Sequence, residues 1–552
     1  MNTTINIIKK YYMFFSKYKI LFTILIISTI LASVTQFMTP LYLGKIIDAI
    51  GEKSFLNMKQ YIFIVILFFI ITMTFSVIET YISSYLQINI QTELEKYLFD
   101  KIVNSKIEVL DKLKGPEIIN RLEEDTNIIS SFYITKLSDY IIEIIKLAIS
   151  IILIFIISIK LSIIALILVP FNFISTIILS KKLKKIQRLT MTIKDKNRAY
   201  IQEIIYGYRE VKSLVIENEV SIDFNKNIDM MKNLSLKQTI FTTISNSVSS
   251  ISSFSINLIL VVYSGWLIIN GNLTLGEFVA FNSYIAYFLS SIKTMWNIPI
   301  DIQLLEISDD RVSEIIEYEI EELKLQADNN DIRGAIRFED VNFKYNNMNK
   351  LAINCLNIEI ENNKLTALIG ENGAGKTTIL NLLTRFYCNY SGSIFIGEKD
   401  IKEFNLKDFR KNITYIQQST FLFNKSIKDN LKLGIDDISN EEIIIACKEV
   451  NIHNYIESLP NKYDTIIDNN GKILSGGQKQ KLAIVRGLLR KTPIFLFDEI
   501  NKGLDFESSR KLMSIIKCLS KRNTVVMISH NKNIFDEADT IIYLKDGAII
   551  NE

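Results

Sequence analysis

Six long runs of apolar residues, nearly free of charge, lie in the first 300 residues of this 552-residue chain. A helix that crosses the hydrocarbon core of a bilayer needs about 20 such residues. One run of this kind could form a buried helix of a soluble protein, but six in series are typical of a membrane domain. We therefore predict transmembrane helices at residues 20–44, 60–80, 138–159, 161–182, 242–269 and 276–299. Because five runs follow the first, we expect the first to be retained rather than cleaved as a signal peptide.

The positions of Lys and Arg indicate which helix ends face the cytoplasm. Four lysines lie between residues 9 and 19, a basic cluster follows at 181–188, and the loop between the last two spans has neither Lys nor Arg. By the positive-inside rule, the N-terminus and the long connections are cytoplasmic, in a multi-pass protein of the cell membrane. The two long connections, about 81–137 and 183–241, have helical patterns, so we predict that the membrane helices continue into the cytosol.

The pattern changes after about residue 320. A polar linker is expected at 321–334, and short β-rich runs then alternate with helices to residue 552. We expect strands at Ala335–Phe338, Leu365–Ile369, Ile413–Ile416, Ile494–Phe497, Thr524–Ile528 and Thr540–Leu544. This alternation indicates a mostly parallel sheet with crossover helices. We therefore predict a membrane domain at 1–320 and a nucleotide-binding domain at 335–552.

A glycine-rich sequence follows the strand expected at Leu365–Ile369. It fits the pattern G-x-x-x-x-G-K-[ST] and consists of Gly370, Glu371, Asn372, Gly373, Ala374, Gly375, Lys376 and Thr377. Glycines let backbone N–H groups face phosphate oxygens, and a following helix, expected from Thr378, adds a favourable field for an anion. We expect Lys376 to bridge the β- and γ-phosphates and Thr377 to bind Mg²⁺. The predicted fold is thus an all-α six-helix transmembrane domain with long intracellular helical extensions, followed by an α/β P-loop NTPase domain.

Two adjacent carboxylates, Asp498 and Glu499, follow the buried strand expected at Ile494–Phe497. Asp498, at the carboxyl end of the strand, suits the coordination shell of Mg²⁺. Glu499 is placed to orient or deprotonate an attacking water. Downstream of a phosphate loop, this pair indicates nucleotide hydrolysis rather than an ordinary strand end.

A Ser-Gly-Gly turn precedes a helix expected near Gln480. The turn is formed by Ser475, Gly476 and Gly477, with Gln478 after it. Such a turn is a second anion site, although it could also be an ordinary capped helix start. Since one nucleotide does not need two such sites on one chain, we infer a site shared between two chains.

The chain has two histidines and four cysteines. His530 follows the strand expected from Thr524 and could contact a γ-phosphate, whereas His453 is expected to be an ordinary residue of a helical stretch. No pair of cysteines has the CxxC spacing, so we expect reduced thiols. No cysteine precedes Cys355, so we expect no N-terminal cysteine peptidase that processes a cargo.

Together these motifs resemble those of an ATP-binding cassette (ABC) exporter of the half-transporter kind, and the resemblance covers nearly the whole chain. It implies ATP and Mg²⁺ as cofactors, with Glu499, His530 and Gln418 as catalytic residues and with Thr377, Gln418 and Asp498 around Mg²⁺. It also implies that Tyr345 stacks on adenine, that Asp505 crosses a dimer, and that Ser475, Gly477 and Gln478 cap the partner's γ-phosphate. Residues 115–125, including Arg121, and 207–212 are similar to the family's two intracellular loops.

Two positions depart from the family pattern. Lys502 stands where many exporters have a small Ser, and Asn469 stands where a Glu is usual. Neither change removes a catalytic group, so we expect two copies of the chain to form two competent sites.

The resemblance implies ATP-driven export of a hydrophobic, amphipathic or peptide-like cargo across the cell membrane. We expect a homodimer, although a heterodimer with another half-transporter is an alternative, as are lipid transport by a flippase and an ATP-gated channel or sensor with little hydrolysis. No charged residue is centred in spans 1, 2, 4 or 5, which disfavours a strongly ionic cargo. The many hydroxyls and amides of 242–257 indicate close helix packing or a polar cavity wall. With Lys+Arg 63 and Asp+Glu 60, the net charge of +3 does not indicate a nucleic-acid partner.

Overall fold

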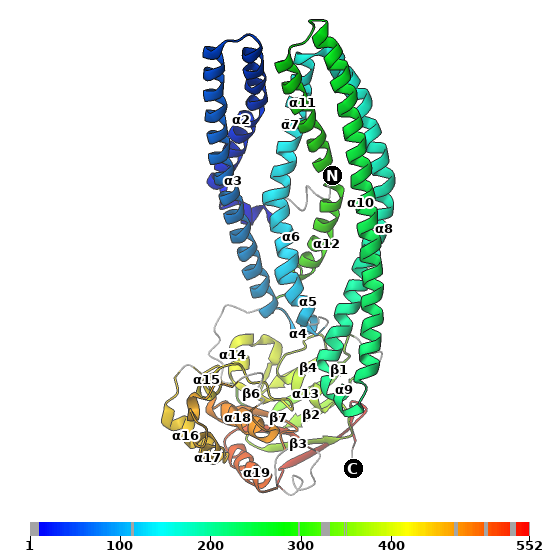
Figure 1. Cartoon of the computed structure of the whole chain (residues 1–552). Coiled ribbons are helices and arrows are strands. Elements are labelled where there is room, and N and C mark those ends of the chain that lie inside the picture. The colour runs from blue at the N-terminus through cyan, green and yellow to red at the C-terminus, as the bar shows by residue number, and fades with distance from the viewer. Residues whose placement is uncertain are drawn as a thin grey trace. The chain divides into compact units, whose positions relative to one another are not determined.

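The computed structural model describes residues 10–111, 115–295, 298–321, 332–346, 348, 350–435, 437–467, 473–501, 506–529 and 537–550. The chain divides into two compact units (Figure 1). We call Met1–Phe99 with Pro116–Ile316 the helical unit, and Asp100–Gly115 with Glu317–Glu552 the α/β unit. The first is a helical, membrane-type domain, and the second is an α/β nucleotide-binding domain, as the sequence predicted.

Long helices make up the helical unit. They are α2 (Lys19–Gly51), α3 (Phe55–Val103), α7 (Leu137–Ile157), α8 (Ile159–Tyr206), α10 (Glu217–Ile269), α11 (Leu275–Met295) and α12 (Ile298–Ile316). Four of the predicted spans, 20–44, 60–80, 161–182 and 242–269, each lie within one of these helices. The span 138–159 crosses the break at Ser158 between α7 and α8, and the span 276–299 includes residues 296–297, which lie outside the described part. With 49, 48 and 53 residues, α3, α8 and α10 are more than twice as long as a bilayer core of about 30 Å requires at about 1.5 Å per residue. They therefore extend beyond any membrane-spanning part.

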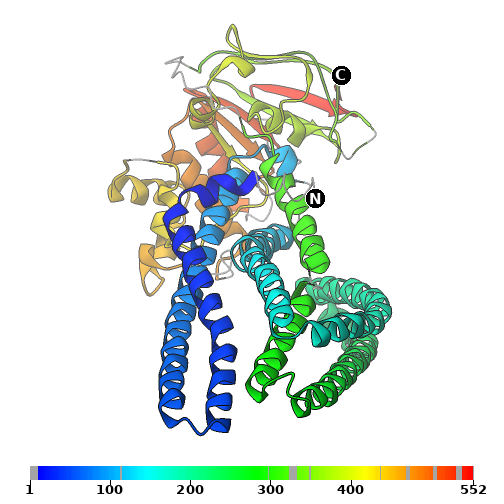
Figure 2. The same ribbon diagram turned by 90° about the horizontal axis from the view of Figure 1, so that it is seen from above.

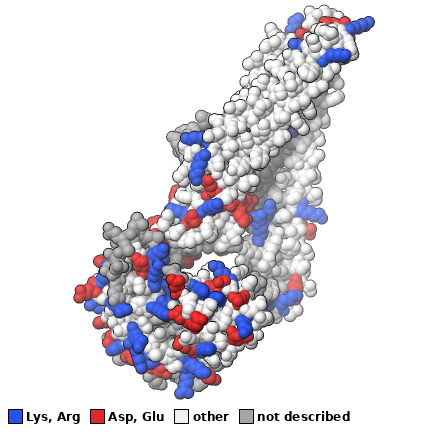
Figure 3. All heavy atoms as spheres, turned by 90° about the vertical axis from the view of Figure 1, so that its left-hand side faces the viewer, with Lys and Arg blue, Asp and Glu red and all other residues white. Residues whose placement is uncertain are grey.

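Four helices of the described residues are long and apolar enough to cross a membrane: α2, α3, the segment Glu117–Ile157 and α10. The side chains of 169–185, within α8, lie outside the described part, so the number of six spans stays a prediction. On the face shown in Figure 3, the helical unit has a long band without charged side chains. Large apolar side chains of α3 are exposed: Phe63, Ile66, Phe69, Ile70, Met73 and Val77. Such a surface suits contact with lipid.

The helices of this unit pack as pairs. Helix α8 lies along α10, and α11 contacts both α7 and α2 (Figures 1 and 2). The α2–α11 crossing is so close that a Cβ atom on Gly276 would lie 2.1 Å from the carbonyl oxygen of Gly44. The Asp48 carboxylate accepts a hydrogen bond of 2.8 Å from the Gly276 N–H at the start of α11. Only glycine allows this approach of two helix backbones.

A six-stranded sheet forms the centre of the α/β unit. Its order is β10-β9-β3-β8-β7-β6, from β3 (Leu365–Gly370), β6 (Ile413–Ile416), β7 (Ile494–Asp498), β8 (Thr524–Ile528), β9 (Thr540–Lys545) and β10 (Ala548–Ile549). All neighbouring pairs are parallel except β9 with β10. The predicted mostly parallel sheet is therefore confirmed. The strands β3, β6, β7 and β8 are mostly buried, whereas β9 and β10 at one side of the sheet are half-exposed.

A second, antiparallel sheet was not predicted. Its order is β2-β1-β4-β5, from β1 (Ile336–Phe343), β2 (Ile353–Ile360), β4 (Ser391–Ile396) and β5 (Lys399–Asp400). The strand expected at Ala335–Phe338 belongs to this sheet, and its assignment to the parallel sheet was wrong. The connection from β1 to β2 is shorter than the dozen or more residues that a parallel crossover needs, so these strands pair antiparallel.

Two chain segments that enter the α/β unit pair with each other. Ser105 and Ile320 form an antiparallel bridge, and the Lys106 N–H donates to the Glu319 carbonyl at 3.1 Å. Arg410 donates two hydrogen bonds, of 2.7 and 2.8 Å, to the Glu321 carboxylate. The short helix α4 (Ile107–Leu110) follows the first of these segments. A bidentate Arg–carboxylate pair thus fixes both segments to the α/β unit.

Candidate active site

The phosphate-binding loop has the predicted place and backbone form. It follows β3, and α13 (Lys376–Leu383) begins two residues before the expected Thr378. Gly373 and Gly375 have φ angles of +87° and +97°, in the left-handed region that favours glycine. A Cβ atom on Gly375 would lie 2.7 Å from the Ala352 carbonyl oxygen. This loop can therefore curl closely around a phosphate, as the motif requires.

Lys376 points back into the curl of this loop. The residue is 6% exposed, and its Nζ donates hydrogen bonds of 2.7 and 2.8 Å to the carbonyl oxygens of Gly370 and Glu371. Burial lowers the pKa of this ammonium, while the Glu499 and Asp498 carboxylates act in the opposite direction. The ammonium is thus held at the loop, where it can exchange carbonyl partners for phosphate oxygens.

Asp498 is the buried carboxylate of the site. It ends β7 and lies 3.4 Å from the Thr377 hydroxyl, which donates to it, and 3.3 Å from the donating Tyr415 hydroxyl. Burial raises the pKa of Asp498, and these two hydrogen bonds oppose that rise. A hydroxyl beside a carboxylate is the oxygen donor set that Mg²⁺ prefers, so these residues fit the predicted ion.

Glu499 and Gln418 meet at the end of the sheet. Glu499 follows β7 with a φ angle of +47°, and its N–H donates to the Ile528 carbonyl at 3.2 Å. The Gln418 Nε2 donates a hydrogen bond of 2.5 Å to the Glu499 Oε2. A left-handed non-glycine residue costs of order 1 kcal/mol and often marks a functional site. The two catalytic residues predicted from different strands thus lie in contact.

Tyr345, the residue predicted to stack on adenine, lies next to the phosphate-binding helix. Its hydroxyl is 3.2 Å from the Thr378 hydroxyl. Its ring packs edge-on against Phe343 and Tyr387, with centroid distances of 4.8 and 5.1 Å. Since the Tyr345 side chain is only partly buried, the ring can accept a planar base on its open side.

The Ser-Gly-Gly turn begins α18 (Gly476–Leu489), four residues before the helix start expected near Gln480. The difference comes from a capping box: the Ser475 Oγ accepts from the Gln478 N–H at 3.3 Å, and the Gln478 Oε1 accepts from the Ser475 N–H at 2.8 Å. Ser475 and Gly476 are exposed, and a Cβ on Gly476 would meet nothing within 4 Å. The turn therefore presents an open helix start to a ligand or a second chain.

Four residues of the sequence analysis lie outside the described part of the chain. They are His530, Asp505, Lys502 and Asn469. Their predicted roles stay predictions.

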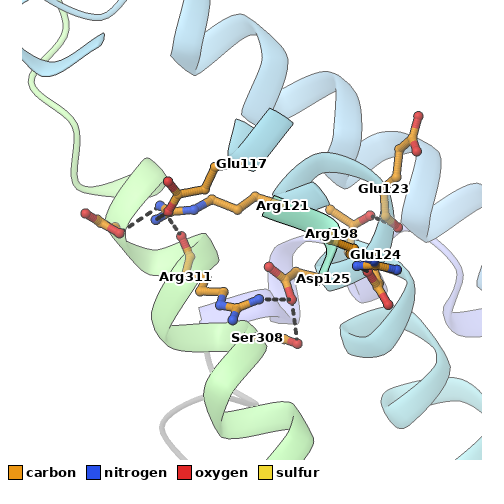
Figure 4. A network of polar contacts seen from close by, with 10 residues as sticks. Glu117, Arg121, Glu123, Glu124, Asp125, Arg198, Ser308 and Arg311 are labelled. Carbon is orange, nitrogen blue, oxygen red and sulfur yellow. Dashed lines mark hydrogen bonds and ion pairs between the residues drawn. The ribbon is translucent and has the colours of Figure 1, made fainter. Parts of the chain in front are cut away.

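Arg121 lies in the helical unit, within a π-helical turn (Arg121–Asp125) between α5 (Gly115–Asn120) and α6 (Thr126–Ser131). Its guanidinium forms ion pairs of 2.7 Å with both Glu117 and Glu314, and donates to the Arg311 carbonyl at 3.2 Å (Figure 4). The segment of this region that belongs to the α/β unit ends at Gly115. Arg121 therefore lies outside the α/β unit, and its ion pairs join α5 to α12 within the helical unit.

Sequence reasoning missed the Tyr415 hydroxyl beside Asp498. Tyr415 lies on β6, which pairs directly with β7, so the two strands bring Tyr415 and Asp498 to the same end of the sheet. Its position three residues before Gln418, at the end of an expected strand, could have suggested this. Sequence reasoning also missed Tyr387, which no motif marks.

Comparison with known families identifies both halves of the chain. The sequence profile described as "ABC transporter transmembrane region" matches residues 22–292. The profile described as "ABC transporter" matches residues 353–502, which include the phosphate loop, the Ser-Gly-Gly turn and both carboxylates.

Individual relatives are similar over most of this chain. It is 28% identical over 532 residues to "ABC transporter B family member 1" of Dictyostelium discoideum, covering 95% of this chain and 58% of the relative. It is 27% identical to a Bacillus subtilis protein provisionally named a multidrug export ATP-binding/permease protein, covering 99% and 96%. It is 28% identical to the ATP-dependent lipid A-core flippase of Haemophilus influenzae, covering 91% and 86%.

Proposed function

Because the chain belongs to the ABC transporter family of ATP-hydrolysing transporters, as a fused half-transporter of the exporter type, we propose that it exports a hydrophobic, amphipathic or peptide-like cargo across the cell membrane. The observation that carries this proposal is the contact between Gln418 and Glu499. This contact lies at the carboxyl ends of the parallel strands, close to Asp498 and Lys376. A nucleotide domain without a placed base could bind ATP but not drive repeated cycles.

In the proposed chemistry, each residue at the carboxyl ends of these strands has one task. Lys376 and the loop N–H groups bind the phosphates, while Glu499 orients and deprotonates water with Gln418 beside it. Mg²⁺, held by Thr377, Asp498 and Gln418, would neutralise phosphate charge. We extend the assignment to His530 at the γ-phosphate and to Asp505 at the dimer contact.

We propose that two copies complete two ATP sites, each with the Ser475 turn of the other copy. The Gly-rich loop before α13 and the capped start of α18 are two separate helix starts of one chain, and each would offer backbone N–H groups to an anion. Half-transporters generally act as dimers, and a heterodimer with another half-transporter is the alternative to the pair of identical copies.

A groove of the α/β unit supports the contact with a second copy. It has a volume of about 560 Å³, and its lining includes the half-exposed Phe421 and Phe423 and the basic Arg486 and Arg490. In the helical unit, α9 (Tyr208–Leu214) has no buried residue, and Tyr208 is 52% exposed. We propose that α9 of one copy fills this groove of the other, with Glu210 toward the arginines.

The cargo proposal rests on the charges of the helical unit. Within the span 138–159, the Glu143 carboxylate accepts from Lys146 at 3.3 Å and from the Ser291 hydroxyl at 2.5 Å. These charges are compensated by neighbours, so they favour an amphipathic cargo over a strongly ionic one. A lipid-like cargo is the second candidate, because a relative of 28% identity is named as a lipid A-core flippase.

Reconstitution of the chain alone tests this proposal. In proteoliposomes with the α/β unit outside, we expect Mg²⁺-dependent ATPase and ATP-dependent accumulation of an amphipathic dye, both absent in Glu499→Gln. The matched control Glu507→Gln, an exposed carboxylate of α19 (Phe506–Ser520), should keep both activities. Ion currents without ATP turnover would instead support a channel, and a monomer with full activity would contradict the dimer. Accumulation of a labelled lipid but not of the dye would favour a flippase.

A further inference from the structure

We propose that Tyr387 is a positioning residue that ties the base-facing ring of Tyr345 to the 104–111 segment through Asp111. The inference rests on the proposed function, because it takes Tyr345 as the residue that stacks on adenine. Tyr387 and Asp111 belong to no nucleotide-binding motif of the chain.

The Tyr387 hydroxyl donates a short hydrogen bond to the Asp111 carboxylate. The next residue repeats the contact, since the Cys388 N–H donates to the Glu108 carboxylate at 3.3 Å. Burial raises the pKa of the Tyr387 phenol, and the hydrogen bond to Asp111 raises it further. The phenol therefore remains a protonated donor at neutral pH, and the contact is a charge-assisted hydrogen bond.

The ring of Tyr387 contacts the ring that would stack on the base. Its centroid lies 5.1 Å from that of Tyr345, with an interplanar angle of 87°, and 5.4 Å from that of Phe343. At its other end, the Tyr345 hydroxyl contacts Thr378 of the phosphate-binding helix. Tyr345 is thus held between α13 and Tyr387, and an edge-to-face pair fixes ring orientation as well as distance.

The 104–111 segment is itself anchored within the α/β unit. The Asn104 carbonyl accepts from the Glu321 N–H at 2.9 Å, and Arg410 holds the Glu321 carboxylate. Asp111 is exposed at the end of α4, where its N–H donates to the Ile107 carbonyl at 3.0 Å, so the helix holds its backbone next to Tyr387. Along the chain, the segment lies between α3 and α5.

Loss of the Tyr387 hydroxyl should therefore weaken recognition of the base and spare recognition of the phosphates. In the reconstituted full-length protein, we expect Tyr387→Phe to raise KM for ATP by about 5-fold, the range of one hydrogen bond. We expect kcat to change less than about 2-fold, because no group at the reacting phosphate moves. The inhibition constant of inorganic tripolyphosphate, which has phosphates but no base, should stay unchanged.

Three variants make the test specific. Asp111→Ala should raise KM for ATP as much as Tyr387→Phe does. In a Tyr345→Ala background, Tyr387→Phe should not raise KM for ATP any further. The control Tyr463→Phe removes another tyrosine hydroxyl of the α/β unit, which lies 2.9 Å from the His453 Nδ1, and should change neither constant.

Two results would overturn the inference: an unchanged KM for ATP in Tyr387→Phe, or an equal rise in KM and in the tripolyphosphate constant, which indicates a general disturbance. If Tyr345→Ala itself leaves KM unchanged, the adenine assignment of the proposed function fails instead. These outcomes distinguish failure of the link from failure of the site.

Discussion

Gln418 and Glu499 are joined by a hydrogen bond of 2.5 Å, from the amide Nε2 to the carboxylate Oε2. The two residues follow adjacent parallel strands, β6 and β7, so the sheet itself sets their separation. The amide donor orients the carboxylate. This arrangement places a potential general base at a defined position beside Asp498.

The first prediction concerns Glu499. Glu499→Gln keeps the size of the side chain and removes the charge that accepts a proton, so ATP hydrolysis should fall by about 100-fold or more. ATP should still bind, because Lys376 and the loop are unchanged, and the nucleotide should remain trapped. Steady-state phosphate release and retention of labelled ATP measure the two effects. ATPase at the wild-type rate would contradict the assignment.

The second prediction concerns pH. The Tyr415 hydroxyl donates to Asp498 and lowers the pKa of a carboxyl that burial raises. Tyr415→Phe should therefore raise that pKa further, leaving less carboxylate for Mg²⁺ as the pH falls. We expect the Mg²⁺ concentration for half-maximal ATPase to rise more between pH 8 and pH 6 in this variant than in the wild type or in Tyr463→Phe. Parallel pH profiles for all three proteins would disprove this role of Tyr415.

Sequence patterns predicted what depends on periodicity and local motifs. The strands β6 and β8 have the predicted bounds, and the phosphate loop has the predicted backbone form. The antiparallel sheet was missed because its strands, such as Ile353–Ile360, are half-exposed, and because the pairing of β1 with both β2 and β4 is not marked by any local motif. The contact of Tyr387 with Asp111 joins residues 276 positions apart, and no local pattern encodes such a separation.

The third prediction concerns the close crossing of α2 and α11. Gly276→Ala would place a methyl group 2.1 Å from the Gly44 carbonyl oxygen and 2.4 Å from the Asp48 carboxylate. The helices must separate, at a cost of about 1–3 kcal/mol, and the unfolding temperature should fall. Gly265→Ala, where a Cβ meets nothing within 4 Å, is the matched control and should be neutral or slightly stabilising. Equal thermal stability of the two variants in detergent would refute the crossing.

The fourth prediction concerns Arg121, whose side chain is 7% exposed between Glu117 and Glu314 (Figure 4). Arg121→Met removes both ion pairs and should destabilise the helical unit by about 1–3 kcal/mol. The loss is not larger because both carboxylate partners are about half exposed and regain contact with water. Arg198→Met removes a cation that is 55% exposed and 3.9 Å from Glu124, so it should have little effect. Thermal unfolding followed by the fluorescence of the two tryptophans measures both. A greater loss for Arg198→Met would contradict the network.

The last prediction distinguishes the four cysteines by burial. Cys355, Cys388 and Cys518 are exposed, whereas Cys447 is buried, and burial raises the pKa of its thiol to about 11. Because the thiolate is the reactive form, an aromatic disulfide reagent at pH 8 should modify three thiols per folded chain, and the fourth only after unfolding. The raised pKa also means that the stability contributed by the protonated thiol is lost as the pH rises from about 9 to 11. Cys447→Ala should therefore lose less stability over this range than the wild type, as denaturant midpoints can measure, and rapid modification of all four thiols at pH 8 would show that Cys447 is accessible.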